Sequence, residues 1–141
     1  MEAKQKDIII NNKEYKAFFQ QVEDSDTKIL EVKDYLGERV GFISFCESYD
    51  VGPIIWINKV FVSEKFRRQG VGSYLLKVVE NYAINHKCVS VDGKMYLGES
   101  SKECLLNFYE KAGFVFWIDG YTKMVTKYIK EQTKSSQEFE F

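Results

Sequence analysis

Hydrophobic positions along the chain recur with different periods, and each period predicts an element, because strands alternate buried and exposed side chains whereas helices repeat every three or four residues. The stretch "KDIIINN" indicates a short first strand. "TKILEVKDYLGERVGFISFCES" predicts two antiparallel strands, since the turn residues around Gly37 separate two β-rich runs. Between these stretches, "KEYKAFFQQVED" predicts a short helix from the spacing of its apolar residues, Tyr15, Phe18, Phe19 and Val22.

The central part of the chain predicts a loop, a strand and a helix in succession. "YDVGP" contains the single proline, Pro53, and is expected to be a loop. Ile54 to Val62, "IIWINKVFV", is rich in β-branched and aromatic side chains and predicts a strand. Gly70 to about Asn85 predicts a helix with one buried face, because apolar residues recur there at helical spacing.

The last third of the chain predicts a strand, a helix and a hairpin. In "NHKCVSVDGKMYLGE" either Cys88 to Val91 or Lys94 to Leu97 can form the strand, and we favour the second, "KMYL", with a turn at "DG". "SSKECLLNFYEKAGF" predicts a helix that begins at the serines and ends at Gly113, a residue type common at helix C-termini. "FVFWI" and "TKMVTKYIK" predict a hairpin across a second Asp-Gly pair.

This order of elements predicts one α/β domain around a mixed sheet. We assign residues 1–130 to this domain and residues 131–141 to a polar C-terminal tail, whose Phe139 and Phe141 are candidates for docking onto the domain. The length agrees, since 141 residues of which 45% are hydrophobic suffice for one core and not for two.

Charge and residue content exclude several classes of function. The 20 Lys and Arg nearly balance the 21 Asp and Glu, so we expect no nucleic-acid partner. The chain has no apolar run of membrane-spanning length and does not start like a signal peptide, so we expect no membrane partner and a cytoplasmic location. Cys46, Cys88 and Cys104 are expected to be reduced thiols, and with His86 as the single histidine we expect no metal site.

The stretch "KFRRQGVGSYLL" is the main candidate for ligand binding. It lacks the Gly-Lys-Ser/Thr triplet of a Walker loop, and Leu75 stands where a dinucleotide fingerprint needs its third glycine. It matches the pattern Arg/Gln-x-x-Gly-x-Gly/Ala between a strand and a helix through Arg67, Gly70 and Gly72. Glycines let a ligand approach the backbone, and N–H groups at a helix start favour negative charge. The alternative is a tight turn with solvated arginines.

In this loop the sequence resembles the GNAT superfamily of acyl-CoA-dependent N-acetyltransferases, because "VFVSEKFRRQGVGSYLL" has that family's strand, spacer, loop and helix in one run. "NFYEKAGFVFW" is similar to the family's closing motif, with Tyr109, Gly113 and Phe114 on the matching positions. The resemblance covers about Ile29 to Lys130. It implies an α/β fold with a GNAT-like mixed, mostly antiparallel sheet, a splayed parallel strand pair and helices on both faces.

The resemblance also implies acetyl-CoA as the acyl-donor cosubstrate. Its pantetheine arm would pair with the strand backbone at Val60, Phe61 and Val62, where an N–H of Phe61 or Val62 would hold the oxyanion. Lys102 stands where the family often has an asparagine that touches the cofactor arm, so that contact departs from the pattern. The diphosphate would lie on the loop and helix start formed by Arg67, Arg68, Gln69, Gly70, Val71, Gly72 and Ser73.

By the same resemblance, Tyr109 would protonate the departing thiolate. A phenol with an ordinary pKa of about 10 is still a proton donor at neutral pH. The alternative is a tyrosine that packs the core. For the acceptor amine, Glu47 and Asp50 are candidates to attract or deprotonate it and Trp56 to line its pocket, with solvated carboxylates and core packing as the alternatives.

Two functions follow. The first is an N-acetyltransferase that moves an acetyl group from acetyl-CoA to a primary amine, either of a small molecule or of a protein. The second is a non-catalytic acyl-CoA-binding or interaction module. Edge strands near the C-terminus could also pair between chains, which by analogy with relatives suggests a homodimer.

Overall fold

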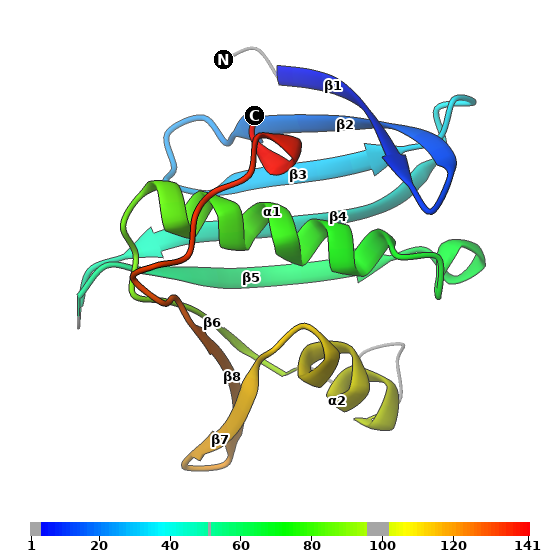
Figure 1. Cartoon of the computed structure of the whole chain (residues 1–141). Helices are drawn as coiled ribbons and strands as arrows, with labels where there is room; N and C mark the ends of the chain where they lie inside the picture. The colour runs from blue at the N-terminus through cyan, green and yellow to red at the C-terminus, as the bar shows by residue number, and fades with distance from the viewer. Residues whose placement is uncertain (1–3, 51, 96–101) are drawn as a thin grey trace.

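The computed structural model describes residues 4–50, 52–95 and 102–141, apart from the side chain of Lys102. These residues form an eight-stranded sheet with α1 packed across its middle (Figure 1). The strand order is β1-β2-β3-β4-β5-β6-β8-β7, and only β5 and β6 pair in parallel. The expected mixed, mostly antiparallel sheet is confirmed. Its elements are β1 (Lys4–Ile10), β2 (Lys13–Gln21), β3 (Lys28–Lys33), β4 (Arg39–Ser48), β5 (Ile54–Val62), η1 (Glu64–Phe66), α1 (Val71–Asn85), β6 (Ser90–Lys94), α2 (Lys102–Lys111), β7 (Val115–Asp119), β8 (Thr122–Tyr128) and η2 (Gln137–Phe139).

The chain begins with a β-hairpin, so the helix predicted for "KEYKAFFQQVED" is wrong. Asn11 and Asn12 have φ angles of 49° and 66°, and a two-residue turn with two positive φ angles matches the twist of a hairpin. Tyr15 and Ala17 of β2 are buried in the core, whereas Phe18 lies on the opposite face of the sheet. The same apolar residues that match a helical spacing therefore alternate between the two faces of a strand.

The central strands lie where the sequence predicts them, but the strand after α1 starts earlier. β3 and β4 pair as expected on either side of Gly37, and β5 has the predicted bounds. The preference for "KMYL" is wrong, because β6 spans Ser90–Lys94, while residues 96 and 97 lie outside the described part of the chain. Gly93, which was expected in a turn, lies inside β6, where the side chain of Ile57 packs against it.

Helix α1 covers one face of the sheet, over β4 and β5. Leu75, Val78 and Val79 from the helix are buried together with Phe45 and Ile55 from the sheet. Burial of each such side chain contributes about 1.5–3 kcal/mol relative to exposure. This packing fixes the start of α1 just beyond the end of β5.

The last described residues return to the start of the chain. The ring of Phe139 packs on Tyr74 of α1, with centroids 5.7 Å apart, and Phe141 stacks on Phe19 of β2 at 5.6 Å. The expected docking of these two phenylalanines is confirmed. Lys6 of β1 donates hydrogen bonds to the backbone carbonyls of residues 137, 138 and 140, so β1 and the last turn lie side by side (Figure 1). Among the helices that the structure describes, none has the length and apolar character needed to cross a bilayer.

Candidate active site

The loop between β5 and α1 presents backbone N–H groups at the start of the helix. Arg68 and Gly70 take left-handed φ angles of 63° and 88°, and Gly70 is the N-cap of α1 without a side-chain capping bond. The N–H of Tyr74 makes the first helical hydrogen bond, to the Gly70 carbonyl. The amides of residues 71–73 therefore have no acceptor among the described residues, and the positive end of the helix dipole lies at the same place.

Each glycine of this loop permits a close contact. A Cβ atom on Gly70 would lie 2.7 Å from Asn11 Nδ2, in addition to the strain of its positive φ. A Cβ atom on Gly72 would lie 2.6 Å from the ring of Phe108, which brings α2 against the first turn of α1. A side chain on Gly70 would displace Asn11, and one on Gly72 would displace Phe108. Both of these residues lie beside the exposed amides.

The N-terminal hairpin holds the loop from the other side. Asn11 Nδ2 donates a 2.7 Å hydrogen bond to the Gln69 carbonyl, and Lys13 Nζ lies 3.2 Å from Gln69 Oε1. The Tyr15 hydroxyl also reaches Gln69 Oε1, at 3.4 Å, and Gln69 Nε2 donates to the Lys65 carbonyl. The side chain of Gln69 is thus bound to the protein, and Lys13 adds a positive charge beside the loop.

The two arginines of the loop lie differently. Arg67 Nε donates to the Val62 carbonyl at 3.1 Å, so this side chain runs along the end of β5. Arg68 is exposed. Together with Lys13, Arg68 places positive charge near the amides of residues 71–73, where an anionic ligand would meet it.

Beyond its middle, β5 separates from β6. The parallel pairing starts at Ile54 and stops, within the described residues, at Ile57, which pairs with Gly93. β5 itself continues to Val62. A register shift in the pairing of β5 with β4 leaves Asn58 as a bulge at the same point. The expected splayed parallel pair is therefore present, with its vertex at Ile57 and Gly93.

The strand register determines which β5 amides face this gap. The N–H of Ser63 donates to the Val40 carbonyl of β4, and hydrogen-bonded and non-hydrogen-bonded pairs alternate along antiparallel strands. Phe61, two residues earlier and opposite Phe42, therefore directs its N–H toward β4. Val60 and Val62 direct theirs toward the gap. Of the three residues predicted to meet the cofactor arm, Val60 and Val62 have the required orientation and Phe61 does not.

Tyr109 lies in α2 with its ring buried, only 4% exposed. The ring makes edge contacts with Phe108 at 5.1 Å and Phe114 at 5.4 Å. Burial raises the pKa of Tyr109 to about 12, so the hydroxyl keeps its proton throughout the neutral range. The ring packs the core, and the hydroxyl keeps the proton that a function as a general acid would require.

A cavity of about 540 Å³ lies beside the vertex, on the face of the sheet away from α1. It brings together two of the three predicted acceptor residues, Asp50 and Trp56. Residues of β7 and β8 also line it, which the sequence did not predict. Asp119, at the β7–β8 turn, supplies a second carboxylate. The lining residues are Ser48, Asp50, Ile54, Trp56, Lys94, Asp119, Thr122 and Met124.

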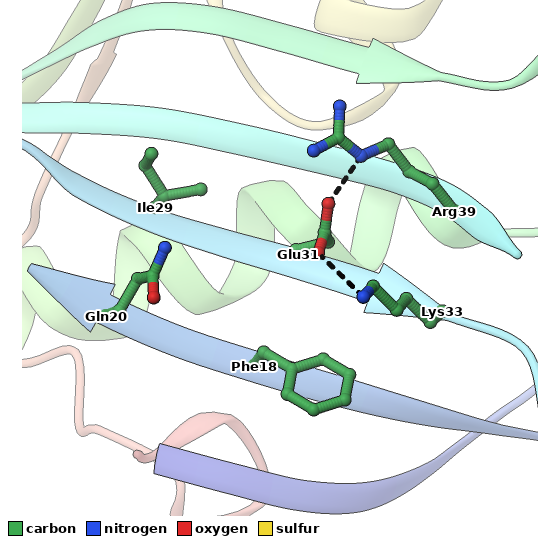
Figure 2. A pocket seen from close by; sticks show the side chains of 6 residues that line it. All are labelled: Phe18, Gln20, Ile29, Glu31, Lys33 and Arg39. Atoms are coloured by element: carbon green, nitrogen blue, oxygen red, sulfur yellow. Dashed lines mark hydrogen bonds and ion pairs between the residues drawn. The ribbon is translucent and has the colours of Figure 1, made fainter. Parts of the chain in front are cut away.

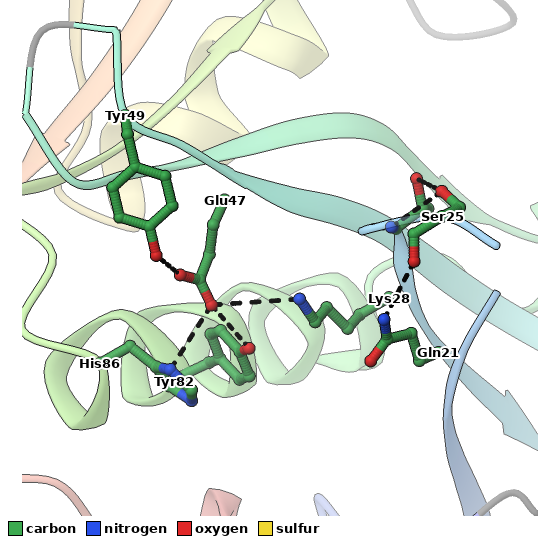
Figure 3. Close-up of polar contacts among 8 residues, drawn as sticks. Gln21, Ser25, Lys28, Glu47, Tyr49, Tyr82 and His86 are labelled. Atoms are coloured by element: carbon green, nitrogen blue, oxygen red, sulfur yellow. Dashed lines mark hydrogen bonds and ion pairs between the residues drawn. The ribbon is translucent and has the colours of Figure 1, made fainter. Parts of the chain in front are cut away.

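Glu47, the remaining predicted acceptor residue, lies on the other face, under α1 (Figure 3). Its carboxylate accepts hydrogen bonds from the hydroxyls of Tyr49 and Tyr82 and lies 3.4 Å from His86 Nδ1. Burial alone would raise the pKa of Glu47, but these hydrogen bonds and the electrostatic influence of the neighbouring His86 and Lys28 outweigh it and lower the pKa. Glu47 thus joins the end of α1 to β4 and does not line the cavity.

A second hollow, of about 250 Å³, lies over β2, β3 and β4 (Figure 2). Its charged groups neutralise one another, because Glu31 pairs with both Arg39 and Lys33. It is separated from the β5–β6 gap by β4, so it does not contribute to the candidate site.

Some predicted features cannot be placed. α2 begins at Lys102, but the contact expected from this side chain lies outside the described atoms, as do the capping serines before it. Within the described ranges, no three potential metal ligands lie together.

Three residues of the site were not found by sequence reasoning. Asn11 was assigned to the first strand's end, although an Asn-Asn pair between two apolar runs indicates a turn. Phe108 precedes the matched tyrosine and carried no signal of its own. The sequence predicts Asp119 only as part of a hairpin turn, which gives no indication that it lines the cavity.

Comparisons with known proteins agree with this geometry. Residues 24–116 match the family described as acetyltransferase (GNAT) domain. Similar solved structures include NAA60 from Arabidopsis thaliana with a bisubstrate analogue (15% identity, TM-score 0.66, 79% of this chain and 80% of that one). PaiA N-acetyltransferase from Thermoplasma acidophilum with coenzyme A has 17% identity, a TM-score of 0.61 and coverage of 74% and 62%. A GNAT acetyltransferase from Elizabethkingia anophelis with acetyl-CoA has 22% identity, a TM-score of 0.58 and coverage of 74% and 77%. The family match spans most of the chain and includes the loop, the splayed strands and Tyr109, and the chain therefore belongs to the GNAT acetyltransferase family.

Proposed function

We propose that this chain transfers an acetyl group from acetyl-CoA to a primary amine. One observation carries the proposal: the unpaired amides of residues 71–73 lie at the end of the strand whose Val60 and Val62 N–H groups face the β5–β6 gap. A diphosphate at the helix start and a pantetheine arm in the gap would use both sets of donors. The coenzyme A and acetyl-CoA in the PaiA and Elizabethkingia structures support the choice of ligand.

The oxyanion would be held by a backbone N–H of β5. Charge develops on the thioester oxygen when the amine attacks, and a fixed N–H in a water-poor gap stabilises it. We assign this role to Val62 or Val60, whose amides face the gap, in preference to Phe61.

Tyr109 would give its proton to the leaving sulfur. Its pKa of about 12 keeps it protonated at neutral pH, and the thiolate of coenzyme A needs a proton as the C–S bond breaks. The buried ring fixes the direction of the hydroxyl through Phe108 and Phe114.

The acceptor amine would bind in the cavity beside the vertex. Asp50 and Asp119 give that cavity negative charge, which favours a cationic amine, and Trp56 offers an aromatic face to it. The bisubstrate analogue bound to NAA60 supports an acceptor that meets the acyl donor directly. We propose a small amine or a protein amino group as the acceptor.

The test is calorimetric titration with acetyl-CoA, followed by thiol release from acetyl-CoA with putrescine, lysine methyl ester and a lysine-containing peptide. We expect acetyl-CoA to bind and at least one amine to release thiol. S-acetylpantetheine, which lacks the diphosphate, is the matched ligand control and should bind at least 10-fold more weakly.

Three outcomes decide the proposal. Equal affinity for S-acetylpantetheine and acetyl-CoA would contradict a diphosphate at residues 71–73. No binding of either ligand would overturn the function altogether. Tight binding without thiol release from any amine would favour the non-catalytic acyl-CoA-binding module.

A further inference from the structure

Lys94 of β6 places a primary amine of the protein itself in the acceptor cavity. Its side chain lines that cavity, on the face of the sheet away from α1, and is exposed. Among the residues that the structure describes, no hydrogen bond or ion pair holds its ammonium group. The cavity that we assign to the acceptor amine therefore already contains one amine of the protein.

The strand register places Lys94 at the edge of the β5–β6 gap. The last parallel pair joins Ile57 to Gly93, so Lys94 is the first residue of β6 beyond the vertex. On its other side β6 stays paired with β8, where Lys94 lies opposite Met124. This pairing holds the backbone of Lys94 in place while its side chain extends to the cavity. An acyl donor with its arm in the gap would thus meet Lys94 at the border between gap and cavity.

Lys59 provides the contrast, because it also lies close to the vertex. It follows Ile57 by two residues in β5, directly after the bulge at Asn58, and it is exposed like Lys94. Its side chain lies in another direction, with Nζ over the ring of Phe42 in β4, 5.8 Å from the ring centroid. An aromatic face attracts a cation placed above it. Because β4 and β6 lie on opposite sides of β5, Lys59 is directed away from the gap.

We propose that Lys94 is itself an acetyl acceptor, and that the protein acetylates this lysine from the acetyl-CoA that it binds. This inference rests on the proposed function, since it uses the same thioester and the same cavity. An amine held beside a bound thioester reacts at a high effective concentration, because the two groups no longer have to meet by diffusion. Lys94 presents the same alkylamine as the lysine of a protein acceptor, and it is tethered at the site.

The step balances with acetyl-CoA as the only other reactant. The Lys94 ammonium first loses one proton to bulk water. The lone pair of Nζ then forms the C–N bond with the thioester carbon, the C–S bond breaks, and its electron pair leaves on sulfur. The nitrogen gives a further proton to water, while Tyr109 gives one to the sulfur and regains it from water. The products are acetylated Lys94 and coenzyme A.

Acetylation changes the charge of the cavity. Lys94 is the one cationic residue among the described residues that line it, whereas Asp50 and Asp119 are carboxylates. Once the lysine has lost its charge, the charged groups of the lining are acidic, and a cationic acceptor meets no repulsion there.

The test incubates the purified protein with saturating acetyl-CoA and follows the acetylation of each lysine by peptide mass spectrometry. We expect Lys94 to react at least about 10-fold faster than Lys59 in the same sample, because of the two only Lys94 borders the gap. The rate per protein molecule should be independent of protein concentration, as for transfer within one molecule. Protein unfolded in urea gives the background of chemical acetylation, in which both lysines should react alike.

Variants show whether the transfer uses the proposed site. Lys94→Arg should lose most of the acetyl group that the folded protein incorporates, because arginine is not an acceptor. Lys59→Arg is the matched control and should incorporate as much as the wild type. Tyr109→Phe should slow the acetylation of Lys94, because the leaving thiolate loses its proton donor.

The possible outcomes separate this inference from the proposed function. Equal acetylation of Lys94 and Lys59 in the folded protein, or a rate that rises with protein concentration, would overturn the inference. A wild type that acetylates added amines and leaves Lys94 unmodified would also overturn it, although the proposed function would then stand. If acetyl-CoA binds and neither Lys94 nor any added amine is acetylated, both fail.

Discussion

Tyr109 is positioned by its ring, and its hydroxyl adds little to the packing. The contacts that hold it are edge interactions with Phe108 and Phe114, which a phenylalanine would keep. Chemistry and stability can therefore be separated at this residue.

We expect Tyr109→Phe to lower kcat about 100-fold, because the leaving thiolate loses its proton donor. Affinity for acetyl-CoA and the melting temperature should change little. Tyr74→Phe is a matched control, since the Tyr74 hydroxyl is buried without a partner in the described structure; it should retain kcat and gain up to about 1 kcal/mol of stability. A Tyr109→Phe variant with full turnover would remove the hydroxyl from the mechanism.

The raised pKa of Tyr109 also predicts the alkaline limb of the reaction. A tyrosine with the ordinary value of 10.0 would lose its proton, and its function as an acid, as the pH passes 10. With a pKa of about 12, Tyr109 remains protonated over that range. We expect kcat measured from pH 7 to pH 11 to lack a fall centred at pH 10, and such a fall would argue against Tyr109 as the acid.

Some residues of the site could be recognised from the sequence, and others could not. Tyr109 and the two loop glycines belong to motifs with fixed spacing, so they could be recognised. Asp119 could not, because an Asp-Gly pair predicts a hairpin turn, and only the folded sheet places this carboxylate at the cavity.

The N-terminal hairpin is the element in which sequence reasoning failed, and it supports the ligand loop. Its apolar residues satisfy both a helical and an alternating pattern, and tertiary pairing with β3 decides for the strand. The turn of the hairpin was better indicated by the two consecutive asparagines, Asn11 and Asn12, which take positive φ angles in the structure. By contrast, β5 was predictable from its β-branched and aromatic residues, and α1 from apolar residues that recur every three or four positions.

We expect Asn11→Gly to weaken acetyl-CoA binding about 2- to 10-fold, the range for loss of one hydrogen bond. Glycine keeps the positive φ of the turn but removes the amide that holds the Gln69 carbonyl. Asn12→Gly is the matched control, because it preserves the same turn and Asn12 makes no hydrogen bond to the loop among the described residues, and its Kd by calorimetry should equal that of the wild type. Equal affinity in both variants would mean that the hairpin does not position the loop.

The junction between the end of α1 and β4 depends on the charge of Glu47. Because its pKa is lowered in the folded protein, its contribution is fully present above the ordinary value of 4.5 and is lost as the pH falls through the lower, folded value. We expect Glu47→Gln to cost about 1 kcal/mol at pH 7 and a smaller amount at pH 3, where part of the contribution is already lost. Denaturant unfolding at both pH values checks this, and a pH-independent difference would contradict it.

At the scale of the whole molecule, the far edge of the sheet is unusually apolar. All five residues of β7 are exposed, including Trp117 and Ile118, and β7 is the outermost strand. Exposed apolar edge strands favour pairing with another chain. Because β7 leads into Asp119 at the cavity, a second copy bound there would lie close to the acceptor site.

We therefore expect a homodimer that pairs through β7. Ile118→Lys should shift the mass measured by light scattering toward that of the monomer, since a lysine on an edge strand opposes pairing. Ile9→Lys, an equally exposed isoleucine on β1, is the control and should leave the mass unchanged. A wild type that is monomeric at all concentrations would contradict the interface.

The contact between Lys6 and the last turn has a consequence for how the molecule opens. One ammonium group bridges the first strand to three carbonyls near the other terminus, and two aromatic rings from that turn insert against Phe19 and Tyr74. Neither β1 nor the last turn can detach without releasing the other. Slow exchange of amide protons in β1 would thus be governed by a segment more than a hundred residues away, and both should become accessible to solvent in one event.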